Sequence, residues 1–141
     1  MNYWLFKSEP NCFSIDDLAK KPQQITPWDG VRNYQARNFM REMEVGDQGF
    51  FYHSSCDVPG IVGIIKVVKK AYPEEVDPRW EHVDVQLIKK FPQIISLEKL
   101  RTIPELKNMI ILRKGNRLSI TPITEKEWNV LIDARPFSSP R

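Results

Sequence analysis

The apolar and polar residues of this chain alternate in several short runs that are typical of β-strands. The pattern predicts five strands, at residues 2–7, 49–54, 60–69, 82–91 and 117–120. In the fourth strand, Val83, Val85 and Leu87 share one face and polar residues occupy the other. Pro92 follows directly and is predicted to end that strand.

Helical periodicity and capping residues predict four short helices between and after these strands. Each helix begins after a side chain that accepts a hydrogen bond from the first turn: Ser14, Asn33, Ser96 and Thr124. The segments that start at Ser14 and Thr124 also fit a capping box. In the second helix a stripe of apolar residues indicates a core-facing surface: Ala36, Phe39, Met40 and Met43. We expect residues 22–27 to form a loop and residues 71–79 to be irregular.

The order of these elements predicts an α+β fold. Strands 49–54 and 60–69 are too close in sequence for a crossover helix, so they are expected to pair antiparallel. We therefore predict a mixed or mostly antiparallel β-sheet, curled or closed into a barrel, with peripheral short helices. Residues 1–135 are expected to form a single domain, and the Pro- and Ser-rich residues 136–141 a frayed tail.

Composition narrows the class of protein only slightly. The 41% hydrophobic content is enough for a sizeable core, and the net charge of +3 is compatible with a nucleic-acid partner without requiring one. No apolar run is long enough to span a membrane, and no signal peptide is evident, so a cytoplasmic location is expected, or a nuclear one in a eukaryote. Cys12 and Cys56 have neither zinc nor disulfide spacing, so no metal and no cofactor is predicted.

No arrangement in the sequence indicates catalysis. The chain contains no nucleophile elbow, no metalloprotease motif and no phosphate-binding glycine loop. His53 and Ser54 are neighbours on a predicted strand, so their side chains point to opposite faces. Ser55 shares the face of His53, but no third orienting residue is evident. The protein is therefore predicted not to be an enzyme.

Three segments, residues 3–10, 28–34 and 51–55, place aromatic rings beside hydrogen-bonding groups. Such a combination is what a pocket for a planar ring requires. If the segments converge in space, the chain binds a nucleobase-like group; if they do not, their aromatics belong to the core. Trp28 is favoured as a pocket wall, whereas Trp4 is assigned to the core together with Trp128.

Several polar residues of these segments have two interpretations. Lys7 and Ser8 can donate to a base and Glu9 can accept from a ring N–H, or all three form a solvated strand end. Asn33 serves either as a helix cap or as a ligand contact. One of the neighbours Tyr52 and His53 faces inward, and alternation alone does not decide which; Ser54 completes that segment.

The basic residues beyond these segments also have two interpretations. Arg32, Arg37 and Arg41 form either a solvated helix face or phosphate contacts beside the pocket. Arg79 and Trp80 form either a flexible lip of the pocket or a surface cover for a sheet edge.

The motifs YWLFKSEP (residues 3–10), WDGVRNYQARN (28–38), GD (46–47), FYHS (51–54) and GIVG (60–63) together resemble the EVE domain family. The resemblance runs from residue 2 to about residue 132 and has no firm motif at residues 71–81. It implies a PUA-like fold and a pocket with aromatic walls that binds a modified base of DNA or RNA. It places these residues around the pocket: Lys7, Ser8, Glu9, Trp28, Asn33, Arg37, Tyr52, His53 and Ser54.

The sequence thus predicts a non-catalytic module that takes a nucleobase from a DNA or RNA partner, and the resemblance implies that this base is modified. Two other classes stay open: an enzyme that acts on a nucleotide or modified base, and a protein-interaction module with Trp28 and Trp80 as exposed anchors. No membrane or metal partner is expected, and a monomer is favoured.

Overall fold

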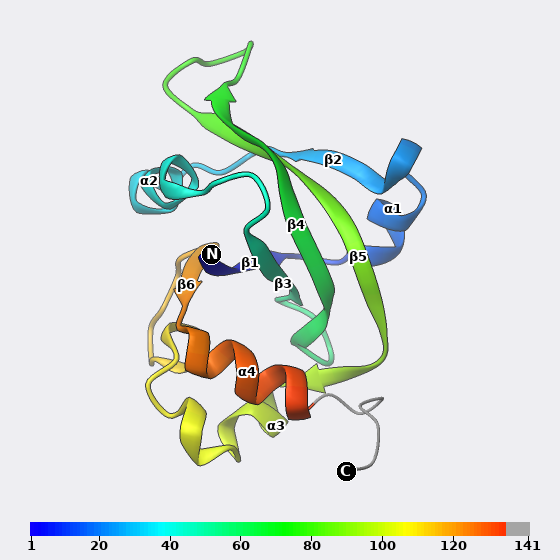
Figure 1. Cartoon of the computed structure of the whole chain (residues 1–141), viewed down its shortest axis with the longest axis vertical. Helices are drawn as coiled ribbons and strands as arrows, with labels where there is room; N and C mark the ends of the chain where they lie inside the picture. The colour runs from blue at the N-terminus through cyan, green and yellow to red at the C-terminus, as the bar shows by residue number, and fades with distance from the viewer. Residues whose placement is uncertain (135–141) are drawn as a thin grey trace.

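The computed structural model describes residues 1–134, so the predicted tail at 136–141 lies outside the described residues. It contains a six-stranded sheet with short helices around it (Figure 1). The strands are β1 (Tyr3–Ser8), β2 (Ile25–Trp28), β3 (Gln48–His53), β4 (Gly60–Pro73), β5 (Glu81–Ser96) and β6 (Ile120–Ile123). The helices are α1 (Ile15–Ala19), α2 (Tyr34–Glu42), α3 (Leu97–Arg101) and α4 (Glu125–Ala134), with 3₁₀ turns η1 (Pro22–Gln24), η2 (Pro104–Leu106) and η3 (Ile110–Leu112).

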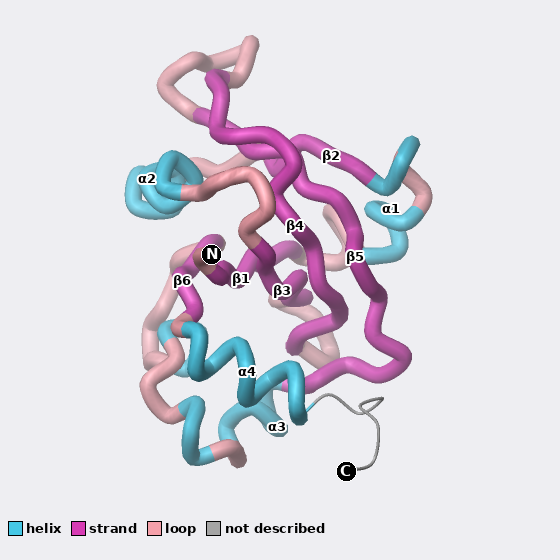
Figure 2. The backbone as a smooth tube through the Cα atoms, in the orientation of Figure 1, coloured by secondary structure: helices cyan, strands magenta, loops and turns pink. Residues whose placement is uncertain are grey.

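The sheet has the strand order β2-β5-β4-β3-β1-β6. The β1–β3 pair is parallel and the other pairs are antiparallel. The long β4–β5 ribbon curves through the whole molecule (Figure 2). The predicted α+β fold with a curled, mostly antiparallel sheet is therefore confirmed. The sheet does not close into a barrel within residues 1–134, because β2 and β6 each pair with a single strand and form its two edges.

Prolines account for most differences between the predicted and observed strands. Pro27 lies in β2, a strand that was predicted as a loop, and Pro122 lies in β6, which begins later than predicted. Both are edge strands, where a missing N–H costs no ladder hydrogen bond if it faces outward. Pro92 does not end β5, because the register with β4 shifts between Ile61 and Gly63 and this irregularity accommodates it.

The predicted helix caps are confirmed. Ser14 Oγ accepts a hydrogen bond from Asp17 N, and the Asp17 carboxylate accepts one from Ser14 N. Thr124 and Glu127 form the same reciprocal arrangement before α4. Such caps are decided by residues three positions apart, so they are visible in the sequence.

Two hydrophobic clusters lie on opposite faces of the sheet. Trp4, Phe6 and Phe51 belong to the cluster that α1, α2 and β2 cover. Leu5 and Phe50 alternate with them and belong to the cluster that α3, η2 and α4 cover. Figure 1 shows α1 and α2 in the upper half of the view and α3 and α4 in the lower half. The predicted core tryptophans Trp4 and Trp128 are both buried, one in each cluster.

Candidate functional site

The ends of β1 and β3 lie side by side and bring the first and third aromatic segments together. In this parallel pair Lys7 is opposite Tyr52 and Ser8 is opposite His53. Ser54 N continues the pairing by donating to Ser8 O at 3.0 Å. Because neighbouring residues on a strand face opposite ways, Ser8 and His53 point to the α1 side of the sheet.

A cleft of about 490 Å³ lies beside the end of β1. We call it the Trp28 cleft, and it is lined by Lys7, Ser8, Cys12, Phe13, Lys21, Thr26, Pro27, Trp28 and Asp29. It joins the first and second aromatic segments at one site, and its volume lies in the range of small-molecule pockets. None of the third segment lines it.

Trp28 serves both the core and the cleft. It lies at the end of β2 and is only 7% exposed. Its ring makes edge contacts with Phe6 and Phe51, each at 5.2 Å between centroids, and with Phe13 at 6.3 Å. These contacts fix the plane of the indole, so the wall it forms is rigid. The sequence suggested a loop tryptophan because the short edge strand carries Pro27 and has no clear alternation.

The residues after β1 form a tight turn that builds another part of the cleft wall. Ser8 Oγ donates to Phe13 O at 2.6 Å, and Glu9 O accepts from the backbone N–H groups of Cys12 and Phe13. The Ser8 hydroxyl thus holds the turn as well as lining the cleft. The Glu9 side chain is exposed and does not line it.

Lys7 is one of two lysines that line the Trp28 cleft. It is partly buried at the end of β1, and burial lowers the pKa of its ammonium group. Its ammonium makes no hydrogen bond or ion pair with any residue between 1 and 134. A partly desolvated cation without a partner is available to an acceptor on a ligand.

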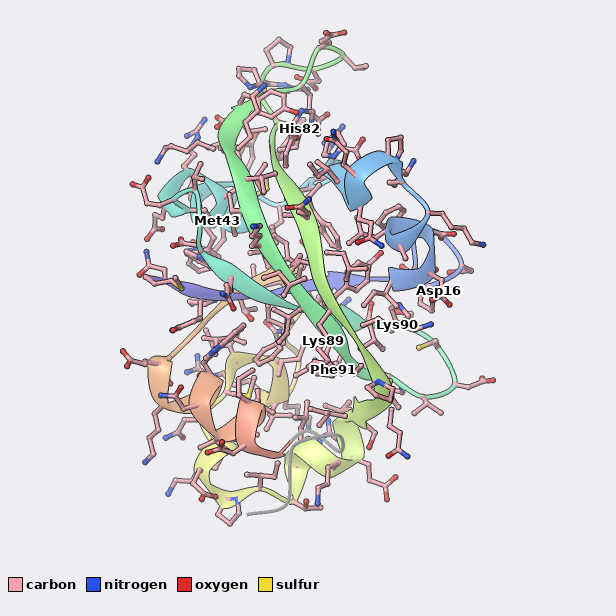
Figure 3. The ribbon with its side chains drawn as sticks, turned by 45° about the vertical axis from the view of Figure 1, so that its right-hand side comes forward. Asp16, Met43, His82, Lys89, Lys90 and Phe91 are labelled. Atoms are coloured by element: carbon pink, nitrogen blue, oxygen red, sulfur yellow. The ribbon has the colours of Figure 1, made fainter. Side chains whose placement is uncertain are left out.

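His53 lies on the α1 side of the sheet and contacts the start of α1. Its Nε2 accepts a hydrogen bond from Ile15 N at 3.2 Å, and its ring packs edge-on against Phe51. Burial lowers the pKa of His53, while nearby Asp16 opposes the shift and Lys90 adds to it. Asp16 of α1 and Lys90 of β5 form an ion pair in the same region (Figure 3).

Tyr52 points to the opposite face of the sheet. It is 2% exposed in the second hydrophobic cluster, and burial raises the pKa of its hydroxyl to about 12. With Ser54 it borders a second hollow of about 420 Å³, which we call the basic groove. That groove is lined by Lys7, Tyr52, Ser54, Ser55, Pro59, Leu97, Arg101, Ile111, Arg113, Lys114, Gly115 and Asn116. The three segments therefore meet around two hollows that share Lys7.

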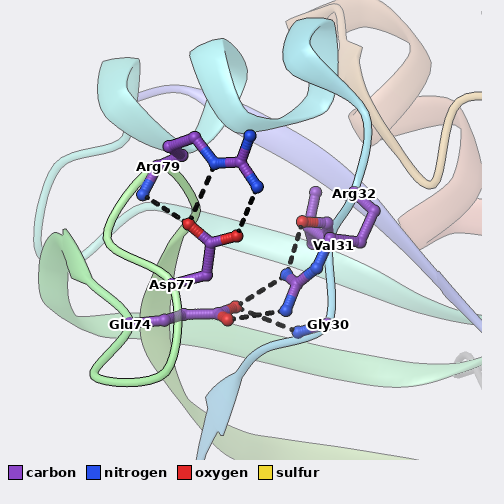
Figure 4. A network of polar contacts seen from close by, with 6 residues as sticks. All are labelled: Gly30, Val31, Arg32, Glu74, Asp77 and Arg79. Carbon is purple, nitrogen blue, oxygen red and sulfur yellow. Dashed lines mark hydrogen bonds and ion pairs between the residues drawn. The ribbon is translucent and has the colours of Figure 1, made fainter.

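Two of the three arginines considered for phosphate contacts form ion pairs within the chain. Arg32 pairs with Glu74, whose buried carboxylate also accepts from Gly30 N (Figure 4). The hydrogen bond from Arg32 lowers the pKa of Glu74. Arg41 pairs with Glu81, and the hydrogen bond raises the pKa of Arg41. These pairs tie α2 and the segment before it to the β4–β5 ribbon.

The third arginine and the predicted lip form a packed corner. Arg37 donates to Arg79 O at 3.0 Å and lies 4.8 Å from the centre of the Tyr34 ring. Trp80 is 9% exposed and stacks on Tyr34 at 4.8 Å. Arg79 itself pairs with Asp77. Neither Arg79 nor Trp80 lines the Trp28 cleft, and Trp80 is no exposed anchor.

Asn33 serves as a helix cap in the structure. Its Oδ1 accepts from Ala36 N at 2.9 Å at the start of α2, and it does not line the Trp28 cleft. Conversely, sequence reasoning missed Lys21, Thr26 and Asp29 as cleft residues. Asp29 directly follows Trp28, so its place beside the indole is a signal that was present in the sequence. Lys21 and Thr26 carry no such signal.

Among residues 1–134, no group of three or more His, Cys, Asp or Glu side chains is arranged to hold a metal ion. None of the described helices has the length and apolar character needed to cross a membrane.

Comparison with known proteins gives a consistent result. The family model described as "EVE domain" matches residues 2–134. Mouse thymocyte nuclear protein 1 is 42% identical, over 93% of this chain and 72% of that protein. A crystal structure of human THYN1 protein in complex with DNA containing 5-methylcytosine is 40% identical with a TM-score of 0.88, covering 99% and 100% of the two chains. A Pseudomonas syringae structure is 41% identical with a TM-score of 0.88, covering 94% and 99%.

Proposed function

Because this chain belongs to the EVE domain family, we propose that it binds a modified base of DNA in the Trp28 cleft, with 5-methylcytosine as the first candidate. The observation that carries this proposal is that Lys7, Ser8 and Trp28 border one cleft. The 5-methylcytosine-containing DNA bound by the human relative supports the choice of ligand. Binding is proposed without covalent change to the base.

The apolar part of the cleft suits the face and the methyl group of such a base. Trp28, Phe13 and Pro27 offer flat or apolar surface next to one another. Stacking of a base on an aromatic side chain contributes roughly 1–3 kcal/mol. Because the Trp28 ring is held by its contacts with Phe6 and Phe51, little side-chain entropy is lost when a base packs against it.

The polar part of the cleft suits the edge of cytosine. The Asp29 carboxylate is an acceptor for the exocyclic N4 amine, as acidic side chains are in the major groove of DNA. Lys7, Lys21 and Thr26 are donors for the ring N3 and the O2 oxygen. A base can present this edge only when it is unpaired, so we propose that the target base leaves its stack before it binds.

Selectivity for the methyl group is expected to be moderate. One methylene in an apolar pocket is worth about 1–3 kcal/mol, or roughly 10-fold to 200-fold in affinity. Discrimination against thymine is expected to be stronger, since thymine presents an O4 acceptor where cytosine presents the N4 donor. An acceptor facing Asp29 would leave both groups unpaired.

The test is a titration of matched oligonucleotides that carry cytosine, 5-methylcytosine or thymine at one unpaired position, as DNA and as RNA. The wild type is expected to bind the 5-methylcytosine DNA most tightly. Asp29→Ala should weaken that complex by about 1–3 kcal/mol. Glu42→Ala, an exposed carboxylate that does not line the cleft, is the matched control and should change little.

Equal affinity of both variants and the wild type for all of these oligonucleotides would contradict the proposal. Tighter binding of the RNA oligonucleotides would support the cleft as the binding site but would identify RNA, not DNA, as the ligand. Mass analysis of the oligonucleotides after incubation separates binding from catalysis, because an enzyme acting on the base would change its mass or release it.

A further inference from the structure

The basic groove carries a concentration of unpaired positive charge. Four of its lining residues are cations: Lys7, Arg101, Arg113 and Lys114. Within residues 1–134 none of the four forms an ion pair. This differs from Arg32, Arg41 and Arg79, each of which is neutralised by a carboxylate of the chain.

Among residues 1–134, no Asp or Glu lines the groove itself. Two acidic residues, Asp57 and Glu98, border an adjoining hollow that shares Arg101 with the groove. Cations of the same sign gathered at one hollow repel each other unless an anion lies between them. The arrangement therefore favours a negatively charged occupant.

The uncharged polar residues of the groove are hydrogen-bond donors of the kind that bind phosphate. The hydroxyls of Tyr52, Ser54 and Ser55 make no hydrogen bond with another residue of the described chain. The side-chain amide nitrogen of Asn116 is buried and lacks a partner within residues 1–134. Buried donors without acceptors are rare in proteins and call for an explanation such as a ligand or an ordered water.

Lys7 connects this groove to the Trp28 cleft, because it is a lining residue of both. The two hollows lie on either side of the paired ends of β1 and β3, where Ser8 and Ser54 meet. A nucleic-acid strand that crosses these strand ends would place a base in one hollow and its backbone over the other.

We propose that the basic groove holds phosphate groups of the same strand whose base enters the Trp28 cleft. The inference rests on the proposed function, since it needs a nucleic-acid strand at the cleft. It assigns Arg101, Arg113 and Lys114 to the backbone and leaves choice of base to the cleft. Phosphate contacts of this kind set position and affinity without specifying sequence.

The experiment measures how affinity for the 5-methylcytosine oligonucleotide depends on salt. The test variant is the double substitution Arg113→Gln and Lys114→Gln, at two exposed residues of the groove. The control is Lys107→Gln with Lys126→Gln, two exposed lysines outside the groove, so both proteins lose the same charge. The logarithmic salt slope should become shallower by about 1 for each groove residue removed, and remain close to that of the wild type in the control.

The groove variant should lose the same factor of affinity for methylated and unmethylated oligonucleotides, and should still bind 5-methyl-2′-deoxycytidine, which has no phosphate. Equal slopes in the groove variant and the control would overturn the inference. The inference would also be overturned if the groove variant lost binding to inorganic phosphate but kept its affinity for the oligonucleotide. The groove would then hold a free anion. If the wild type binds oligonucleotides without preference for the modified base, the proposed base recognition fails. A shallower salt slope in the groove variant would still support phosphate binding in the groove. If the wild type binds no oligonucleotide, both proposals fail.

Discussion

The Arg32 guanidinium and the Glu74 carboxylate form a two-pronged ion pair, with Nη2 to Oε1 at 2.8 Å and Nη1 to Oε2 at 3.1 Å. Glu74 directly follows β4, at the far end of the β4–β5 ribbon (Figure 4). Arg32 follows Trp28 and Asp29 of the cleft in the sequence. Glu74 also accepts from Gly30 N, and Gly30 has φ of +76°, a conformation that favours glycine. The ribbon end thus holds the segment that follows the cleft wall.

The first prediction concerns this pair. Glu74→Gln removes the charge from a buried acceptor of three hydrogen bonds, two from Arg32 and one from Gly30, and should lower the free energy of unfolding by about 1–3 kcal/mol. Asp77→Asn, which removes the neighbouring carboxylate that pairs with exposed Arg79, should have a smaller effect. Urea unfolding measures the free energy of unfolding of both variants. Equal losses would contradict a larger contribution of Glu74 to stability.

The second prediction concerns the pH dependence of the contact between His53 and the start of α1. Because burial lowers the pKa of His53, the folded protein favours the neutral ring, whose Nε2 accepts from Ile15 N. The stability from this contact should be complete above the ordinary histidine pKa of about 6.5. It should be lost as the pH falls through the lowered pKa of the folded protein.

Two measurements check this pH dependence. The His53 ring protons should titrate below pH 6.5 in an NMR experiment, and the Ile15 amide should exchange with solvent faster once the ring is protonated. His53→Gln should abolish this pH-dependent increase in Ile15 exchange. His82→Gln leaves His53 in place and should keep the increase. An increase that disappears in His82→Gln instead would contradict the assignment.

The third prediction uses the two cysteines of the chain. Cys12 is exposed and lines the Trp28 cleft, whereas Cys56 is partly buried and does not line it. Saturating 5-methyl-2′-deoxycytidine should slow alkylation of Cys12 severalfold by covering the thiol. Cys56 should react at an unchanged rate and acts as an internal control. Peptide mass spectrometry over time measures both rates, and equal protection of the two thiols would place the nucleoside elsewhere.

The fourth prediction concerns a buried carboxylate that supports the start of β1. Asp47 is 3% exposed and accepts hydrogen bonds from Trp4 Nε1 at 3.1 Å and from the backbone N–H groups of Asn2 and Glu44. Asp47→Ala leaves these donors unsatisfied and should lower the free energy of unfolding by at least about 1–3 kcal/mol. Glu44→Gln, which removes only the exposed pair with Lys70, should change it by less than about 1 kcal/mol. Asp47 and Glu44 belong to the same turn. A similar loss of unfolding free energy in both variants would therefore contradict the role of Asp47.

Local features of the fold were predictable from the sequence. The caps at Ser14 and Thr124 depend on residues three positions away, and the alternation of Val83 and Val85 depends on residues two positions away. The EVE domain resemblance, which is confirmed, rests on motifs in a fixed order. Strand ends were less predictable. Whether Pro92 ends β5 depends on the register of β4, which is a property of a partner strand.

The site was predictable only in part, for the same reason. Lys7, Ser8 and Trp28 meet at one cleft, as their segments suggested. The role of Arg32 was not visible, because its partner Glu74 is 42 residues away in the sequence. Tyr52 and His53 take opposite sides of the sheet, and only the positions of α1 and α3 show what each side contacts. The cytoplasmic location, the monomeric state and the non-catalytic role remain predictions.

The place of β1 in the sheet has a consequence for how the chain folds. β1 is an interior strand, and its two neighbours are β3 and β6, which comes more than 100 residues later in the sequence. During synthesis, one edge of β1 therefore stays unpaired until Ile120–Ile123 leaves the ribosome. Such distant pairing slows folding and exposes an aggregation-prone edge in the meantime. The strand that ends at the Trp28 cleft is thus completed late, so the binding site forms only when nearly the whole domain is present.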